Sequence, residues 1–247
     1  MCIRDRRYPV AGLILVFLLA FGIFLVALMP AAVMTPLLPT PATDNASLPP
    51  PKLYGLWWNG QGQAQWEGQQ LDITWRLDWR GLTPGLELGF ESGQVNATGW
   101  AGADWGDWRF EHWQASIPIA LLNDFLPQGK AEGQLDISLP QLSLAGTEIS
   151  AISGKLAYSG GTVTLGPGMD RQVPAIDGKL EMEKGVPVLT VTGPDQQSLA
   201  HANLTGKTLT LEVFRALPAL LEMSEGGNAT DVVFSTRQDL PVSAHAG

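Results

Sequence analysis

Acidic side chains are the residues of this chain whose type and spacing come nearest to catalytic chemistry. Asp104 and Asp107, with Glu111 close behind, provide the two carboxylates that glycoside hydrolysis requires. Nothing in the neighbouring sequence distinguishes them from ordinary acids in a turn between strands. We therefore read them as turn residues and not as a catalytic pair.

The remaining reactive side chains form no recognisable site. Cys2 is the single cysteine of the chain and so has no intramolecular disulfide partner. The three histidines are too far apart in the sequence to show the spacing of metal ligands. The chain also has no Gly-x-Ser-x-Gly elbow, no phosphate-binding glycine loop with lysine and no dinucleotide fingerprint. The sequence predicts no enzyme, no metal site and no cofactor. The histidines are His112, His201 and His245.

Charge and composition narrow the class of protein. The chain has 247 residues, a net charge of −9 and only 15 Lys plus Arg, which argues against a nucleic-acid partner because that needs a basic face. A hydrophobic content of 45 % is enough for a folded core. Charged residues make up 16 %, against about a quarter in an average domain, and Gly, Pro and Trp are frequent. This profile favours strands and turns over helices.

The N-terminal region predicts a transmembrane helix over residues 10–30. The stretch 10–29 has no charged side chain and is long enough to cross about 30 Å of hydrocarbon. Arg6 and Arg7 precede it, and no Lys or Arg follows until Lys52, so we expect a single-pass protein of the bacterial inner membrane. Its N-terminus would be cytoplasmic and its body periplasmic. The competing interpretation is a cleaved signal peptide.

The rest of the chain divides by composition. Residues 1–6 (MCIRDR) resemble the translation of a transposase adapter, so we expect the natural start to be missing and give Cys2 no weight. Six prolines between positions 35 and 51 predict an extended linker. The predicted segments are a cytoplasmic N-terminus (1–9), the transmembrane helix (10–30), a Pro-rich periplasmic linker (31–52), a periplasmic β-sheet domain (53–213), and a short helix with a polar tail (214–247).

Alternation of apolar and polar residues predicts an antiparallel β-meander. It is clearest over 71–79, where every odd position is apolar, and weaker copies recur to residue 213. Hairpin turns are expected at Gly160–Gly161 and at 183–185. Residues 117–126 predict one short helix packed on the sheet, and 213–223 predict another. The predicted fold class is all-β: the transmembrane helix followed by a curved open antiparallel sheet or half-barrel.

Tryptophan is unevenly placed, because all nine tryptophans lie from position 57 to position 113. Trp75 and Trp79 share a face with other apolar residues and are expected in the core. Four others sit among Gly and Asp, and a core position and an exposed surface for a protein partner or for sugar stacking remain equally open for them. These candidates for a partner surface are Trp100, Trp105, Trp108 and Trp113.

The ordered set of motifs resembles the type II secretion system protein N family. The run GLWWNGQGQA from position 55, the strand LDITWRL from 71 and the blocks IPIALLNDFLP and ISGKLAYSGGTVTL follow the family's order over about residues 10–206. Tyr158 departs from it, since the family often has Trp there. The residues that carry the resemblance are Gly55, Trp57, Gly60, Ala64, Trp75, Leu77, Gly154 and Leu156.

The resemblance implies an accessory or structural component of the type II secretion system. Such a component would be anchored in the inner membrane and would work through contacts with other inner-membrane subunits, with no catalytic residues to carry over. The chain is also similar to the wider AsmA-like envelope proteins. The alternative function is therefore lipid handling, with acyl chains bound on an apolar sheet face as in AsmA-like or lipopolysaccharide-export proteins. A third hypothesis is glycan binding by the tryptophans.

Overall fold

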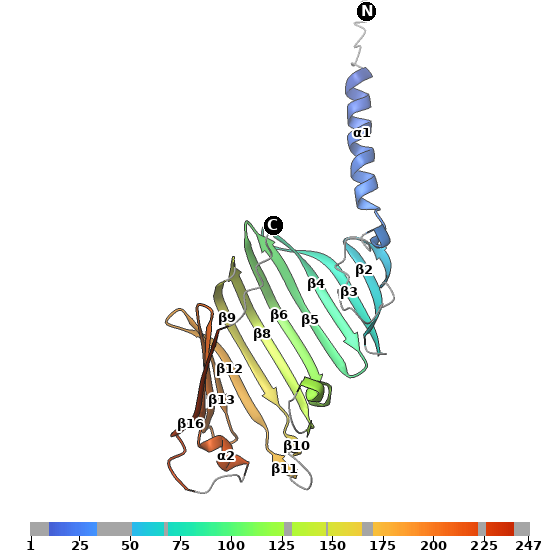
Figure 1. Ribbon diagram of the computed structural model, residues 1–247. Helices are drawn as coiled ribbons and strands as arrows, with labels where there is room; N and C mark the ends of the chain where they lie inside the picture. Colours follow the sequence, from blue (N-terminus) through green and yellow to red (C-terminus); the bar gives the residue numbers. More distant parts are fainter. Residues whose placement is uncertain are drawn as a thin grey trace, which may run out of the picture. The chain divides into compact units, whose positions relative to one another are not determined.

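The computed structural model shows a chain built almost entirely of antiparallel strands (Figure 1). It divides into two compact units, unit 1 (Met1–Arg76) and unit 2 (Leu77–Gly247). The predicted N-terminal segment 1–9 and most of the predicted linker, 34–50, lie outside the described residues. The structure describes residues 10–33, 51–66, 69–125, 130–146, 148–164, 170–221 and 226–239.

Unit 1 contains one helix and a three-stranded meander. The helix α1 (Val10–Ala27) is followed by β1 (Lys52–Leu56), β2 (Asn59–Trp66) and β3 (Gln69–Arg80), whose last four residues belong to unit 2. Strand β2 pairs with β1 on one side and with β3 on the other, both antiparallel. The strand predicted from the alternation over 71–79 is confirmed, because it lies within β3.

Helix α1 is shorter than predicted. It ends at Ala27, and Pro30 then forms an isolated antiparallel bridge with Leu56 of β1. Within the part of the chain that the structure describes, no helix is both long and apolar enough to span a bilayer. The structure therefore does not support the transmembrane helix predicted over residues 10–30.

Unit 2 is a long antiparallel meander, which confirms the predicted β-rich fold class. Each strand pairs with the next one along the sheet, and the two longer connections carry small insertions. The strands are β4 (Thr83–Ser92), β5 (Val95–Asp104), β6 (Asp107–Pro118), β8 (Gln134–Ala145), β9 (Glu148–Tyr158), β12 (Ile176–Glu183), β13 (Val186–Thr192), β14 (Ser198–Thr205), β15 (Thr208–Phe214) and β16 (Val232–Asp239).

The insertions in the two longer connections show that one predicted hairpin is wrong. A 3₁₀ helix, η2 (Ile119–Phe125), occupies the position of the helix predicted over 117–126. Three short strands, β7 (Lys130–Ala131), β10 (Gly161–Thr164) and β11 (Asp170–Val173), form a separate sheet in the order β11-β10-β7. The predicted turn at 160–161 is therefore wrong as a hairpin, because β9 pairs with β12 while β10 leaves the large sheet. The turn predicted at 183–185 is confirmed between β12 and β13.

The C-terminal region also differs from the prediction. The helix α2 (Ala216–Leu220) is shorter than 213–223, because Val213 and Phe214 remain in β15. The sequence predicts a polar tail within 214–247, but residues 232–239 form β16, which pairs with β15. The alternation of apolar and polar residues in this segment is too weak to predict a strand. Its strand conformation comes from backbone pairing with β15.

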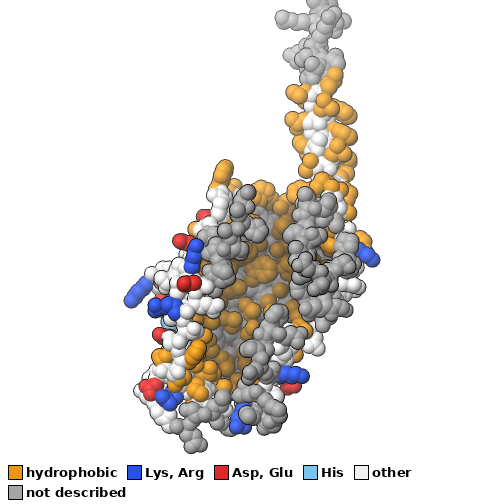
Figure 2. All heavy atoms as spheres, in the orientation of Figure 1, with side chains coloured by type: hydrophobic (Ala, Val, Ile, Leu, Met, Phe, Trp, Pro, Cys, Tyr) orange, Lys and Arg blue, Asp and Glu red, His pale blue; other side chains and the backbone are white. Residues whose placement is uncertain are grey.

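Strand register separates an apolar face of the unit 2 sheet from a polar one. Cross-strand rows on opposite faces differ sharply in composition, and Figure 2 shows hydrophobic side chains gathered over the middle strands. One row is wholly apolar: Leu86, Ala101, Phe110, Leu142 and Ile152. The adjacent row is polar with one exception: Glu87, Trp100, Glu111, Gln141 and Ser153.

Candidate interaction surfaces

Trp100 is the exception on the polar face, and it is fully buried at 0 % exposure. Its ring lies over two glycines of neighbouring strands. A Cβ at Gly85 would sit 2.4 Å from Trp100 Cζ2, and one at Gly102 would sit 2.2 Å from Cη2. Only glycine leaves room for the indole at these positions. Trp100 therefore presents no ring surface to a partner or a sugar.

Arg80 lies beside the Trp100 ring. Its Cζ lies 5.1 Å from the ring centroid, in the range of a cation–π contact. The same guanidinium donates to Glu111 Oε2 at 2.8 Å and lies 2.7 Å from Nδ1 of His112, which sits at a bulge with φ 53°. The Trp100 N–H finds no hydrogen-bond partner among the described residues. Packing against Gly85 and Gly102 and the contact with the Arg80 guanidinium therefore hold this ring in place.

The carboxylates considered for catalysis do not converge on a common space. Asp104 forms an ion pair with Arg109 at 3.5 Å, and Arg109 also donates to Thr83 Oγ1. Glu111 is paired with an arginine as well, as described above, whereas Asp107 is exposed. Across the described residues, no group of three His, Cys, Asp or Glu side chains gathers to hold a metal ion. The ion pairs of Asp104 and Glu111 connect side chains of different strands.

Trp113 belongs to the apolar face and is half-buried. Its ring stacks on Phe90 with centroids 6.2 Å apart, and its Nε1 donates to the carbonyl of Trp100 at 2.9 Å. A Cβ at Gly99 would lie 2.3 Å from Trp113 Cδ2, so glycine is needed there too. Trp100 and Trp113 thus pack on opposite faces of the same part of the sheet.

Four apolar side chains near two adjacent turns are exposed, and we call them the tip patch. They are Trp79 (60 %), Leu82 (95 %), Trp105 (104 %) and Trp108 (51 %). The core position predicted for Trp79 is wrong, because Trp79 lies next to the turn at the end of β3, where nothing described covers it. Alternation does not predict an exposed Leu82, because Leu82 lies in the turn between β3 and β4.

Tryptophans in unit 1 hold the end of α1. Trp57 Nε1 donates to the carbonyl of Val26 at 2.7 Å, and Trp58 Nε1 donates to that of Ala27 at 2.9 Å. These carbonyls lie in the last turn of the helix, where backbone acceptors lack the full set of helical partners. The Val26 carbonyl also accepts from the backbone N–H of Met29 at 3.3 Å. Trp75 Nε1 donates in turn to the carbonyl of Trp57 at 3.0 Å. The three indoles thus connect the helix end, the β1–β2 turn and β3.

Glycines of the predicted motif lie close to these tryptophans and to the β1–β2 turn. A Cβ at Gly60 would lie 2.4 Å from Trp75 Cζ2, and Gly55 adopts φ 87° beside the β1–β2 turn. Ala64 pairs with Leu71 on β3. Gly55, Trp57, Gly60 and Trp75 therefore come together in unit 1.

The other motif residues lie in unit 2. Leu77 is the first residue of unit 2, within β3. Gly154 and Leu156 lie in β9, where a Cβ at Gly154 would approach Leu139 Cδ2 to 2.5 Å and Leu156 pairs with Ile137. Gly154 and Leu156 are packing positions of the sheet. The residues of the motif therefore lie partly in unit 1 and partly in unit 2 and do not form a single site.

A comparison with family models decides the family. The model of type II secretion system protein N matches residues 52–212, from the first residue of β1 into β15. The chain belongs to the type II secretion system protein N family. The match confirms the resemblance seen in the sequence and identifies the chain as a component of a secretion system. This family is not a known enzyme family. No curated protein and no solved structure matches the chain.

Among the described elements, α1, α2 and β16 lie outside the matched residues. Strand β16 is the last strand of the sheet and pairs with β15 alone among the described strands. Its apolar side chains are exposed: Val232 by 49 %, Val233 by 41 % and Phe234 by 54 %. An exposed apolar edge strand is a template for pairing with another chain.

Tyr158, at the end of β9, joins the large sheet to the small one. Its hydroxyl donates to the carbonyl of Glu132 at 2.6 Å. Burial first, and the nearby Glu132 carboxylate second, raise the pKa of Tyr158 above its ordinary value. The hydroxyl therefore stays protonated and remains a hydrogen-bond donor.

Proposed function

We propose that the chain is an accessory, structural component of the type II secretion machine that acts through periplasmic protein contacts in the export of folded proteins across the outer membrane. The observation that carries this proposal is the family match over residues 52–212. The match favours the secretion machine over the alternative of lipid handling on the apolar sheet face. The sheet also offers surfaces suited to protein contacts.

The edge of β16 is the surface that we propose for a partner subunit. Backbone N–H and C=O groups on the free side of an edge strand can pair with an added strand, and its alternate side chains add specificity. The exposed side chains of Val232 and Phe234 lie on this strand. Because β16 lies beyond the family match, this contact would be a property of this chain and its close relatives.

A photo-crosslinking amino acid at Thr236 tests the proposal. Thr236 is exposed on β16, and we expect adducts with other subunits of the secretion machine, identified by mass spectrometry after isolation from intact cells. The matched control is Gln141, which is also exposed but lies on β8 between two paired neighbours. We expect several-fold fewer adducts there. Adducts that contain no secretion subunit at either position would contradict the proposed function.

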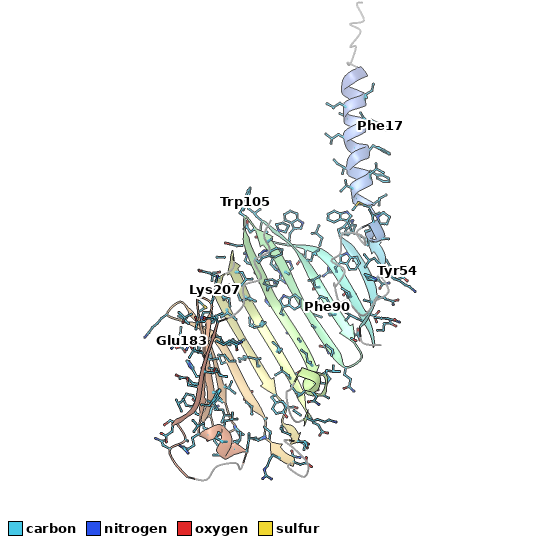
Figure 3. All side chains as sticks on the ribbon, viewed as in Figure 1. Phe17, Tyr54, Phe90, Trp105, Glu183 and Lys207 are labelled. Carbon is cyan, nitrogen blue, oxygen red and sulfur yellow. The ribbon has the colours of Figure 1, made fainter. Side chains whose placement is uncertain are left out.

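We further propose that α1 contacts envelope lipid. Every large apolar side chain from Ile14 to Leu28 is exposed, between 48 % at Phe21 and 67 % at Phe17. A helix that is apolar on all sides is stable only where water is excluded. Lipid meets that need, and Figure 3 shows these side chains pointing outward around the helix axis, with Phe17 labelled.

Flotation with phospholipid vesicles measures this contact. We expect the full chain to rise with the vesicles in a density gradient, and the double variant Leu18→Glu, Ile23→Glu to do so several-fold less, because two carboxylates on opposite sides of the helix oppose transfer into lipid. A wild-type chain that stays in the dense fraction would show that α1 is covered by something other than lipid.

A further inference from the structure

The two outer strands of the large sheet differ in how their free edges are covered. At β1, Pro30 forms an antiparallel bridge with Leu56. The backbone N–H of Trp57 also donates to the carbonyl of Met29 at 3.2 Å. At β16, the last strand of the sheet (Figure 1), no described residue pairs on the side opposite β15. Strand β16 therefore presents a row of backbone groups that the described residues leave unpaired.

Side-chain packing does not determine what this strand binds. All eight residues of β16 are exposed, whereas those of β15 are half-buried. The large apolar side chains of β16 are its first three, Val232, Val233 and Phe234, whereas the backbone edge runs along the whole strand. Backbone N–H and C=O groups along an edge are satisfied by another extended segment. The surface that β16 offers is therefore suited to an added strand.

A bulge limits regular pairing to residues 234–239. The register between β15 and β16 shifts between Val213 and Phe214, which leaves Val233 as an extra residue. Beyond the bulge the alternation is unbroken, so an added strand meets two distinct faces. The even positions lie opposite Val213, Leu211 and Leu209, and the odd positions lie opposite Glu212, Thr210 and Thr208.

Arg237 gives this edge a preference for charge. It is the one basic residue of β16 and is exposed. Its neighbour on β15 is Thr210, and no described carboxylate forms an ion pair with it. Asp239, the other charged residue of the strand, accepts a hydrogen bond from Thr208 Oγ1 at 2.7 Å. Because opposite charges on directly paired residues stabilise strand pairing, Arg237 favours a segment with a carboxylate opposite it.

A second copy of β16 does not provide that carboxylate. In a symmetric antiparallel pair the apolar faces must stay on the same side, since a slip by one residue turns every side chain to the other face. The registers that meet this condition and join most of residues 234–239 place either Ser235 or Arg237 of the second copy opposite Arg237. The first supplies no charge and the second opposes like charges. The edge therefore fits a different chain.

We propose that the free edge of β16 receives an extended segment of another protein, which pairs with residues 234–239 and carries a carboxylate opposite Arg237. Alternate side chains of the segment continue the two faces of the sheet. Those on one face extend the apolar row beside Phe234, and the carboxylate lies on the other. The inference rests on the contact proposed for β16 and names the chemistry that fills it.

Binding of designed peptides to the full chain in detergent tests the inference. The probes are fluorescein-labelled β-hairpin macrocycles whose outer strand alternates valine and threonine, with either glutamate or lysine at the centre of the threonine face. We expect the glutamate probe to bind several-fold more tightly by fluorescence anisotropy, and Arg237→Glu to reverse this preference. The matched control, Lys155→Glu, should leave the preference unchanged, because Lys155 is exposed on β9, which is paired on both sides.

Probes with N-methylated amides along the outer strand separate backbone pairing from charge attraction. N-methylation should abolish binding, because it removes the donors that an edge strand requires. Binding that survives N-methylation would overturn strand addition, and equal affinity for the two charged probes would overturn the role of Arg237. A dimer of the full chain that the glutamate probe dissociates would assign the edge to a second copy instead.

Crosslinking at Thr236 distinguishes this inference from the proposed function. Adducts should become several-fold fewer in the Arg237→Glu chain, and the mapped segment of the partner should contain Asp or Glu near the crosslinked residue. Adducts with a secretion subunit through a segment that lacks an acid would overturn the inference and leave the proposed function standing. Arg237-dependent adducts with an acidic segment of an unrelated protein would support the inference and overturn the proposed function.

Discussion

Replacing Trp100 with alanine is expected to lower the free energy of unfolding by about 3–5 kcal/mol, the range for removing a large buried aromatic ring. Trp100 is 0 % exposed, and its removal leaves Gly85 and Gly102 facing a void that neither can fill. Arg80 loses the ring beside which its guanidinium lies. The loss should appear as a lower urea midpoint, followed by far-UV circular dichroism of the full chain in detergent.

Trp105→Ala is the matched control for this variant. Trp105 is fully exposed, so its removal should change the free energy of unfolding by no more than about 0.5 kcal/mol. Equal destabilisation by the two variants would mean that the burial of Trp100 does not stabilise the sheet.

The second large effect is expected from Gly102→Ala, which adds one methyl group beside the Trp100 ring. The new Cβ would lie 2.2 Å from Trp100 Cη2 and 2.8 Å from the carbonyl oxygen of Pro84, so the ring or the strand must shift. Such overpacking costs about 1–3 kcal/mol. The same urea titration measures it.

Gly193→Ala provides a control with the same change in composition. A Cβ there would meet its nearest neighbour, Gln197 Cγ, at 3.4 Å, which is an ordinary contact. We expect a midpoint close to that of the parent chain. A midpoint for Gly102→Ala that matches this control would show that the glycine is not needed for the packing of Trp100.

Much of the fold could be predicted because alternation of side chains is a local property. The segment 71–79 alternates without a break and forms β3, and the turn at 183–185 carries the left-handed residues Lys184 and Gly185 that close a tight hairpin. The pairing partner of a strand is not local. Gly160–Gly161 has the residues of a hairpin, but contacts with Glu132 and Val173 take the chain into the small sheet.

The candidate site could be predicted only in part, because composition alone does not separate one tryptophan from another. Trp100 and Trp105 both have Gly and Asp nearby, but Trp100 lies within a strand opposite a glycine-containing strand, whereas Trp105 occupies a turn. The glycines at 85, 99 and 102 are a usable signal, since each makes room for an indole. Strand β16 carries no comparable signal, because its pairing with β15 depends on backbone hydrogen bonds.

The indole bonds at the end of α1 have a mechanical consequence for unit 1. Trp57 and Trp58 hold the carbonyls of Val26 and Ala27, and the backbone N–H of Trp57 donates to the carbonyl of Met29 at 3.2 Å. Three hydrogen bonds to neighbouring residues at the helix end restrict rotation of the helix about that end. Any tilt or torque applied to the helix therefore passes directly into the first β-hairpin, without travelling along the chain that connects them.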